Sequence, residues 1–162
     1  MRATRKLLAV AASSGKVGFV YLSRDDLLDW GLSRKASKNV DEAFKQATAW
    51  LTYYQPTLIL TERIDEGTRK GKHTRSLIEA ALGAANALNI KSETVVRRSR
   101  HANKYVEAAA LAQEFPQLEP WLPRPRKIWE PEPRNVIYFE ALALAKEWLK
   151  EDDPRTTAKI GF

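Results

Sequence analysis

Short apolar runs open the chain. Residues 7–12 are apolar throughout, residues 13–16 supply a turn, and residues 17–22 form a second run rich in β-branched and aromatic side chains. Two such runs joined by four residues are typical of a β-hairpin. Residues 25–32 predict a third strand at the edge of the sheet. Because side chains alternate along a strand, the apolar side chains expected on one face of it are Leu28, Trp30 and Leu32.

The most informative run is residues 57–62, with the sequence TLILTE, which follows Pro56. A short apolar run between a turn former and a charge predicts a buried strand. Glu62 would then stand at the edge of a sheet, and in open α/β sheets that edge is where ligands bind. The alternative is that Glu62 only marks where the strand meets water and pairs with Arg63.

Amphipathic stretches separate the later strands. Asn39 is a suitable N-cap for a first helix, because acidic residues follow in the first turn, where the helix dipole favours them. A second helix is rich in alanine around Gly83, which would let it lie close to the sheet. Residues 93–98 predict a fifth strand. The helices are expected over residues 40–54, 73–88, 102–114 and 135–150.

The order β-β-β-α-β-α-β-α-loop-α predicts a single α/β domain over residues 1–150, followed by a loose tail over residues 151–162. Residues 116–134 hold six of the eight prolines, which excludes a regular element there and predicts a proline-rich arm. Right-handed crossovers would make the fourth and fifth strands parallel to the first. The ends of these three strands would lie side by side, and they are Ala11, Glu62 and Arg97.

Composition narrows the chemistry. The 162 residues contain no cysteine, which excludes disulfides, thiolate metal sites and thiol nucleophiles. Two histidines are too few for a zinc site without cysteine, and nothing supports a serine triad. No apolar run approaches the roughly 20 residues that span a bilayer, so no membrane partner and a cytoplasmic location are expected. The formal net charge of +7 attracts polyanions, nucleic acid above all.

The predicted order of strands and helices resembles that of the RNase H-like fold. Three motifs along it resemble those of one group with this fold, the RuvC-type Holliday-junction resolvases. Residues 7–14 (LLAVAASS) match the family's first strand, Glu62 matches the glutamate that ends its fourth strand, and residues 140–145 (EALALA) match the acid and Ala-Leu-Ala of its last helix. The similarity spans residues 5–150. It implies a five-stranded mixed sheet with helices on both faces.

The resemblance also implies a magnesium-dependent nuclease in which Glu62 and Glu140 are catalytic residues and metal ligands. Two-metal phosphodiester hydrolysis needs several carboxylates around the ions. This chain has Ala11 where the family has its first aspartate, and Ile137 where it has another acidic residue or histidine. The resemblance therefore implies a weakened or lost metal centre, unless a nearby acid substitutes. Among the other acids, Asp25, Asp26 and Asp29 are expected near the far end of the hairpin and on the edge strand. Asp65 and Glu66 follow the fourth strand closely and could fold back, and Glu130 and Glu132, shortly before the last helix, are the best candidates from that side unless they are ordinary surface charges.

Basic residues gather after the fourth strand, after the fifth strand and in the proline-rich arm. If the fold is as expected, all three clusters lie on one side of the sheet and favour contact with phosphates. Each could equally be an ordinary solvated surface. Trp121 and Trp129 could stack on unpaired bases or hold the arm against the domain. The expected nucleic-acid-binding residues are Arg69, Lys70, Lys72, Arg75, Arg97, Arg98, Arg100, Lys104, Arg126 and Lys127.

Three hypotheses follow. The first is a domain that binds branched or structured nucleic acid, DNA rather than RNA, with a weakened or lost nuclease centre and no cofactor. The second is a divergent endonuclease that uses Mg²⁺, Glu62, Glu140 and a substitute acid. The third is a protein-interaction domain that uses the proline-rich arm. The resemblance also allows a homodimer.

Overall fold

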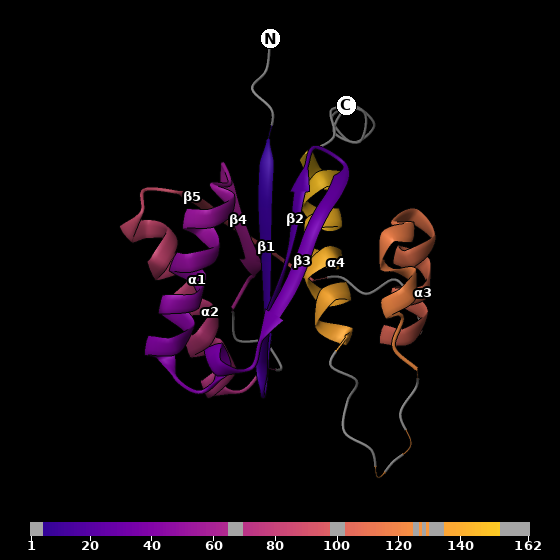
Figure 1. Cartoon of the computed structure of the whole chain (residues 1–162), viewed down its shortest axis with the longest axis horizontal. Helices are drawn as coiled ribbons and strands as arrows, with labels where there is room; N and C mark the ends of the chain where they lie inside the picture. Colours follow the sequence, from indigo (N-terminus) through magenta and orange to yellow (C-terminus); the bar gives the residue numbers. More distant parts are fainter. Residues whose placement is uncertain are drawn as a thin grey trace.

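A computed structural model describes residues 5–64, 70–97, 103–124, 127, 129 and 135–152. Five strands and six helical segments follow one another in the expected order (Figure 1). They are β1 (Lys6–Ser13), β2 (Lys16–Ser23), β3 (Asp26–Ser33), the 3-10 helix η1 (Lys35–Ser37), α1 (Val40–Tyr54), β4 (Leu58–Glu62), α2 (Lys72–Ala87), β5 (Lys91–Val95), α3 (Lys104–Glu114), the 3-10 helix η2 (Pro116–Trp121) and α4 (Val136–Asp152).

The strands form one mixed sheet in the order β3-β2-β1-β4-β5. β1 pairs antiparallel with β2 through a tight turn at Gly15, and β2 pairs antiparallel with β3. β4 is parallel to β1, and β5 is parallel to β4. The expected α/β class and five-stranded mixed sheet are confirmed, and β1 lies at its centre.

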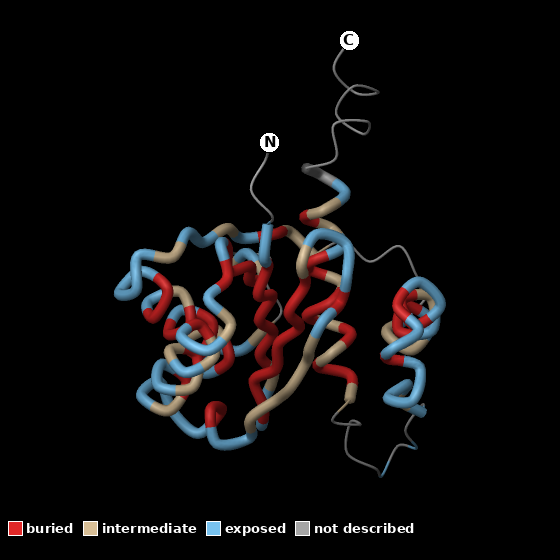
Figure 2. The backbone as a smooth tube through the Cα atoms, turned by 45° about the horizontal axis from the view of Figure 1, so that its top comes forward, coloured by how far each residue is buried: buried red, intermediate tan, exposed pale blue. Residues whose placement is uncertain are grey.

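Both faces of the sheet are covered, which explains why β1 is apolar at every position. Leu7, Ala9 and Ala11 face the core formed with α3, η2 and α4, whereas Leu8, Val10 and Ala12 face the core formed with α1 and α2. Figure 1 shows α1 and α2 on one side of β1 and α4 on the other, with α3 beyond α4. The central strands are buried along almost their whole length (Figure 2).

The helix ends follow local chemistry. The Asn39 side chain accepts a hydrogen bond of 2.8 Å from the backbone N–H of Glu42, so the expected N-cap of α1 is confirmed. Asn103 caps α3 in the same way. Four of the five alanines of α2 are buried against the sheet and α1, as its composition predicts. No helix in the described part of the chain is both long and apolar enough to cross a bilayer.

The expected face of the third strand is wrong at one position. The register between β2 and β3 shifts, because Leu22 pairs with Leu27 whereas Tyr21 pairs with Asp29. This bulge leaves Leu28 without a partner and 56% exposed, and Leu27 is buried instead. Alternation along the strand cannot reveal an inserted residue.

Two boundaries also differ. β5 spans Lys91–Val95 rather than residues 93–98, because its register with β4 pairs Leu58 with Lys91 and Glu62 with Val95. The start of the proline-rich arm does form a regular element, the 3-10 helix η2, which has a proline in its first turn and Leu118 fully buried. The rest of the arm lies largely outside the described residues, as do residues 153–162.

The contact between β2 and α4 yields a test. A Cβ built on Gly18 would lie 2.8 Å from both Cγ1 and Cγ2 of Ile137, so Gly18→Ala should destabilise the fold by about 1–3 kcal/mol through overpacking. Gly83 in α2 has room for a methyl group, with Phe44 at 3.8 Å, so Gly83→Ala should stabilise by about 0.5–1 kcal/mol. Urea unfolding midpoints at unchanged m-value measure both effects.

The coupling between substitutions at Gly18 and at Ile137 provides the control. Ile137→Ala should cost less in the Gly18→Ala background than in the wild type, since the added methyl group partly fills the space that the truncation opens. Strictly additive effects, or a Gly18→Ala variant as stable as the wild type, would contradict the close contact.

Candidate functional site

The three parallel strands end at the same edge of the sheet, which we call the carboxyl edge. Glu62 is the last residue of β4 and pairs with Val95 of β5, and Arg97 follows two residues later. Ala11 lies two residues beyond the last parallel pair between β1 and β4. α4 crosses this edge and contributes Glu140. The expected meeting of Ala11, Glu62, Arg97 and Glu140 is therefore observed.

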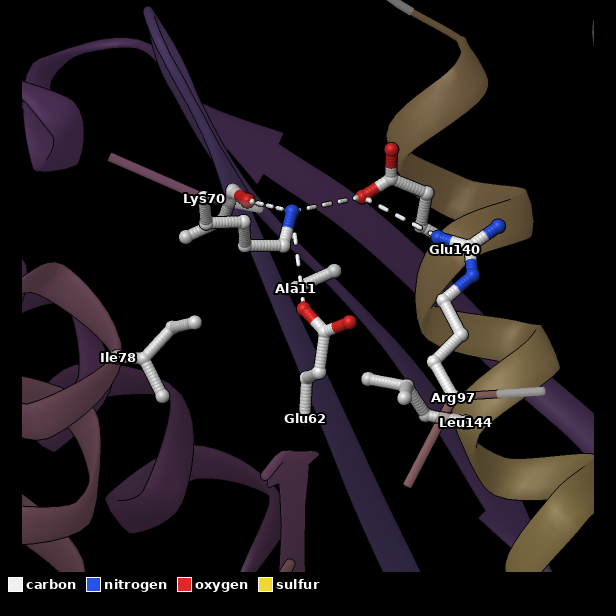
Figure 3. Close-up of a pocket in the computed structure, with 8 residues that line it drawn as sticks. Ala11, Glu62, Lys70, Ile78, Arg97, Glu140 and Leu144 are labelled. Carbon is white, nitrogen blue, oxygen red and sulfur yellow. Dashed lines mark hydrogen bonds and ion pairs between the residues drawn. The ribbon is translucent and has the colours of Figure 1, made fainter. Parts of the chain in front are cut away.

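These residues surround a small recess with about 210 Å³ of space between atoms, solvent at its mouth included. Figure 3 shows the carboxylates and cations pointing toward one another across it. The residues that line the recess are Ala11, Ala12, Glu62, Lys70, Ile78, Arg97, Glu140 and Leu144.

The ammonium group of Lys70 lies between Glu62 and Glu140, which we call the carboxylate pair. Its Nζ donates a hydrogen bond of 2.8 Å to the carbonyl oxygen of Ala12. The same atom lies 3.5 Å from Oε2 of Glu140 and 3.9 Å from Oε2 of Glu62. The three side chains are 16–21% exposed, so solvent and salt screen these interactions less than at an open surface.

Arg97 is the second cation of the recess. Its Nη1 lies 3.9 Å from Oε2 of Glu140, and its Nη2 donates a hydrogen bond of 2.6 Å to Oε1 of Glu107. Glu107 belongs to α3 and is buried, so it holds the guanidinium in place. Sequence reasoning missed Glu107, because a lone glutamate on a helix carries no signal that a distant arginine will contact it.

The two positions that depart from the resolvase pattern belong to the apolar core. Ala11 is 4% exposed and Ile137 is 1% exposed, and both contact the cluster between the sheet and α4. Ala11 pairs with Gly18 across the hairpin, and Ile137 packs onto Gly18. The space over this part of the sheet is thus filled by aliphatic side chains.

The described residues do not fit a pair of magnesium ions. Magnesium needs oxygen ligands in near-octahedral geometry. No group of three or more histidine, aspartate or glutamate side chains in the described ranges could hold a metal ion. The carboxylate pair is flanked by two cations, and the Ala12 carbonyl already accepts a hydrogen bond. Oε2 of Glu140 is buried without a hydrogen bond, but both cations lie at ion-pair distance from it.

Among the candidate substitute acids, those that the structure describes lie elsewhere. Asp26 is the first residue of β3 and pairs with Ser23, which in turn pairs with Lys6 at the start of β1. Asp26 and the preceding Asp25 therefore lie at the opposite end of the strands from Glu62. Asp29 accepts a hydrogen bond from the Tyr54 hydroxyl. Burial, and then this bond, raise the pKa of Tyr54. The other candidates lie outside the described residues: Asp65, Glu66, Glu130 and Glu132.

The expected nucleic-acid-binding residues divide into three groups. Lys70 and Arg97 lie at ion-pair distance from Glu140 in the recess, so their charges are partly engaged. Lys72 and Arg75 lie in the first turn of α2, Lys104 begins α3 and contacts the Tyr105 ring, and Lys127 lies over the Trp129 ring. Arg69, Arg98, Arg100 and Arg126 lie outside the described residues.

The structure adds η1 to the basic residues of the carboxyl edge. β3 ends next to the start of β2, so Lys35 and its neighbours Arg34 and Lys38 come to this edge. The ring Nε2 of His73 lies 2.7 Å from the carbonyl oxygen of Ser37, which joins η1 to the start of α2. In the sequence these three basic residues stand far from the other basic clusters, so only the sheet register shows that they lie at the same edge.

The tryptophans differ in exposure. Trp148 is buried in the core, and Trp50 is partly buried against Phe19. Trp121 packs edge-on against Trp30 and so holds η2 to β3, as one of the two expected alternatives requires. Trp129 is 78% exposed beside Lys127, a position from which its ring is accessible to a ligand.

Comparison with solved structures gives similarity over nearly the whole chain. Thermus thermophilus RuvC is 13% identical with a TM-score of 0.60, and the match covers 96% of each chain. T. thermophilus RuvC in complex with Holliday junction substrate is 13% identical, with a TM-score of 0.56 and 97% and 96% coverage of this chain and that one. The fowlpox virus resolvase in complex with Holliday junction DNA is 12% identical, with a TM-score of 0.59 and coverage of 90% and 97%.

No protein-family model matches the sequence, and no curated protein does. At identities of 12–13% the likeness shows the fold and leaves the activity open. The chain therefore has the RNase H-like fold of the RuvC and poxvirus Holliday-junction resolvases.

Proposed function

We propose that this domain binds branched DNA and that its nuclease centre is weakened or lost. Support for binding comes from the fold, which is shared with two resolvases solved on junction DNA, and from the basic residues along its carboxyl edge. The observation that carries the proposal for the nuclease centre is the apolar packing of Ala11 and Ile137 beside a carboxylate pair that already holds the ammonium group of Lys70 between its members.

The start of α2 favours a polyanionic partner. The amide dipoles of a helix make its N-terminus positive, and acidic residues usually stand there. α1 follows that rule with Asp41 and Glu42, but α2 has no acidic residue in its first turn and no side-chain cap at Gly71. Lys72 and its basic neighbours therefore add positive charge to a positive helix end. A phosphate at this place would relieve the repulsion.

Contacts with phosphates would give affinity without sequence specificity. Discrimination for a junction would come from shape, since a branched molecule presents phosphates to the carboxyl edge from more than one arm. We include a homodimer in the proposal, because two copies would present two such edges to a four-armed substrate. Light scattering of the free and the junction-bound protein measures this.

Binding should therefore depend on salt and on the carboxyl edge. In EDTA, the full chain should bind a fluorescent four-way junction more tightly than a linear duplex of the same sequence. The logarithm of Kd should rise linearly with the logarithm of salt concentration. Lys72→Glu should weaken binding to all DNA shapes and lower the salt slope by about 1 or more.

Lys91→Glu is the matched control, because Lys91 is exposed at the start of β5, at the opposite edge of the sheet. It makes the same change in net charge and should leave the salt slope close to the wild-type value. Equal losses of DNA affinity in Lys72→Glu and Lys91→Glu would mean that binding depends only on the net charge of the protein. Salt-independent affinity would contradict phosphate contact.

Cleavage separates this proposal from the divergent endonuclease. The wild-type chain should leave a four-way junction intact in Mg²⁺ and in Mn²⁺, as judged by denaturing gels of end-labelled strands. If products appear, Glu62→Gln identifies their origin. Cleavage that this change abolishes would establish a working centre, whereas cleavage that it leaves unchanged comes from a contaminant.

The third hypothesis, a protein-interaction domain, is favoured only if junction binding and cleavage both fail. Its central element, the proline-rich arm, lies largely outside the described residues. Nothing in the described part of the arm favours a protein partner over DNA.

A further inference from the structure

The recess contains its own cation. We propose that the ammonium group of Lys70 takes the place of a metal ion at the carboxylate pair, so that its presence keeps a single divalent ion out of a site that, among the described residues, also lacks the ligands of a two-ion centre. This inference rests on the proposed loss of the nuclease centre, but it does not depend on DNA binding.

Oxygen atoms surround the Nζ atom of Lys70 at one hydrogen-bond distance and two ion-pair distances. A lysine ammonium has three N–H donors and no acceptor. Three oxygen atoms converge on it from separate elements: the Ala12 carbonyl of β1 at 2.8 Å, Glu140 of α4 at 3.5 Å and Glu62 of β4 at 3.9 Å. Carboxylate and carbonyl oxygens are also the ligands that a hard divalent cation takes. Lys70 therefore occupies the direction from which such an ion would be held (Figure 3).

Charge balance explains why a cation is needed there. Two carboxylates in one shielded recess repel each other unless a positive charge lies between them. Arg97 contacts Glu140 but also Glu107, so its charge is shared between two acids. The two cations and the three carboxylates leave a formal charge of one negative unit. Lys70 is thus the cation shared by both members of the carboxylate pair.

A divalent ion would face two obstacles in the wild-type recess. It would stand beside a guanidinium and an ammonium, and it would need several oxygen ligands in a near-octahedral arrangement. The other sides of the recess are formed by aliphatic groups, including Ala11, Ile78 and Leu144. Removal of the lysine charge leaves only the Arg97 guanidinium beside the ion and frees the Ala12 carbonyl, so that this carbonyl and the carboxylate pair become available to one ion.

The position of Lys70 between the two carboxylates also has a structural consequence. Lys70 precedes α2 by two residues, so its contacts attach the start of that helix to β1, β4 and α4. The carboxyl edge would keep its shape without metal.

The test is thermal unfolding of the full chain without DNA, with MgCl₂ or MnCl₂ added at constant ionic strength. The wild-type Tm should stay within about 1 °C across the titration. Lys70→Met removes the charge and keeps the side-chain length. Its Tm in EDTA should fall by about 2–4 °C or more, as expected for a domain of this size, and should then rise saturably with either metal.

Lys45→Met is the matched control, because it makes the same chemical change at a lysine that is exposed on α1. It should show no saturable response to metal. A saturable rise of the wild-type Tm would overturn the proposal, and so would a Lys70→Met variant that does not respond to metal or responds no more than Lys45→Met.

If Lys70→Met does not fold, two measurements keep the question open to refutation. Electron paramagnetic resonance of free Mn²⁺ should detect no bound ion with the wild-type protein, and Lys70→Arg, which keeps the charge, should behave in the same way. Bound Mn²⁺ in either would overturn the proposal. Junction binding in EDTA is an independent readout. If the wild-type protein does not bind DNA and its Tm does not respond to metal, only the proposed function is rejected.

Discussion

Two carboxylates from distant parts of the chain share one shielded recess, and the balance of their charge is the constraint on which the carboxyl edge depends. Like charges brought together out of water repel, so the fold needs cations at the same place. Lys70 lies between Glu62 and Glu140, and Arg97 supports Glu140 from the other side. Glu107 in turn orients Arg97. These contacts join β1, β4, α2, α3 and α4 at a single point.

Packing and charge are linked through α4. Gly18 allows Ile137 to approach the sheet closely, and the same approach brings Glu140 to Glu62. As a result, Ala11 and Ile137 belong to a buried apolar core, and their side chains offer no ligand atoms. A fold can keep a surface that binds a polymer while its chemical centre changes, because function depends on local sites rather than on the fold as a whole. Phosphate contacts need only exposed cations on a rigid edge, whereas phosphodiester hydrolysis needs several carboxylates placed around metal ions.

The order of strands and helices follows from the sequence because apolar runs and amphipathic stretches differ in period. The parallel arrangement follows from the handedness of crossovers, which is nearly invariant. Two local errors have physical causes. The bulge at Leu28 inserts a residue that alternation cannot show, and the start of β5 depends on its register with β4. A proline inside a 3-10 helix misled the expectation for η2, because that short helix needs few backbone donors.

The sequence by itself determined which strand ends meet, and so placed Ala11, Glu62 and Arg97 at one edge before any contact was known. The tertiary structure alone decided what their side chains touch. Lys70 lies 58 residues from Ala12 along the chain, and a flexible four-carbon stem can direct its charge outward to phosphate or inward to carboxylate. Only the closing of α4 over the sheet brings Glu140 within reach of that stem. The direction of a long charged side chain is set by the other charges that folding places around it, and a linear sequence does not contain those distances.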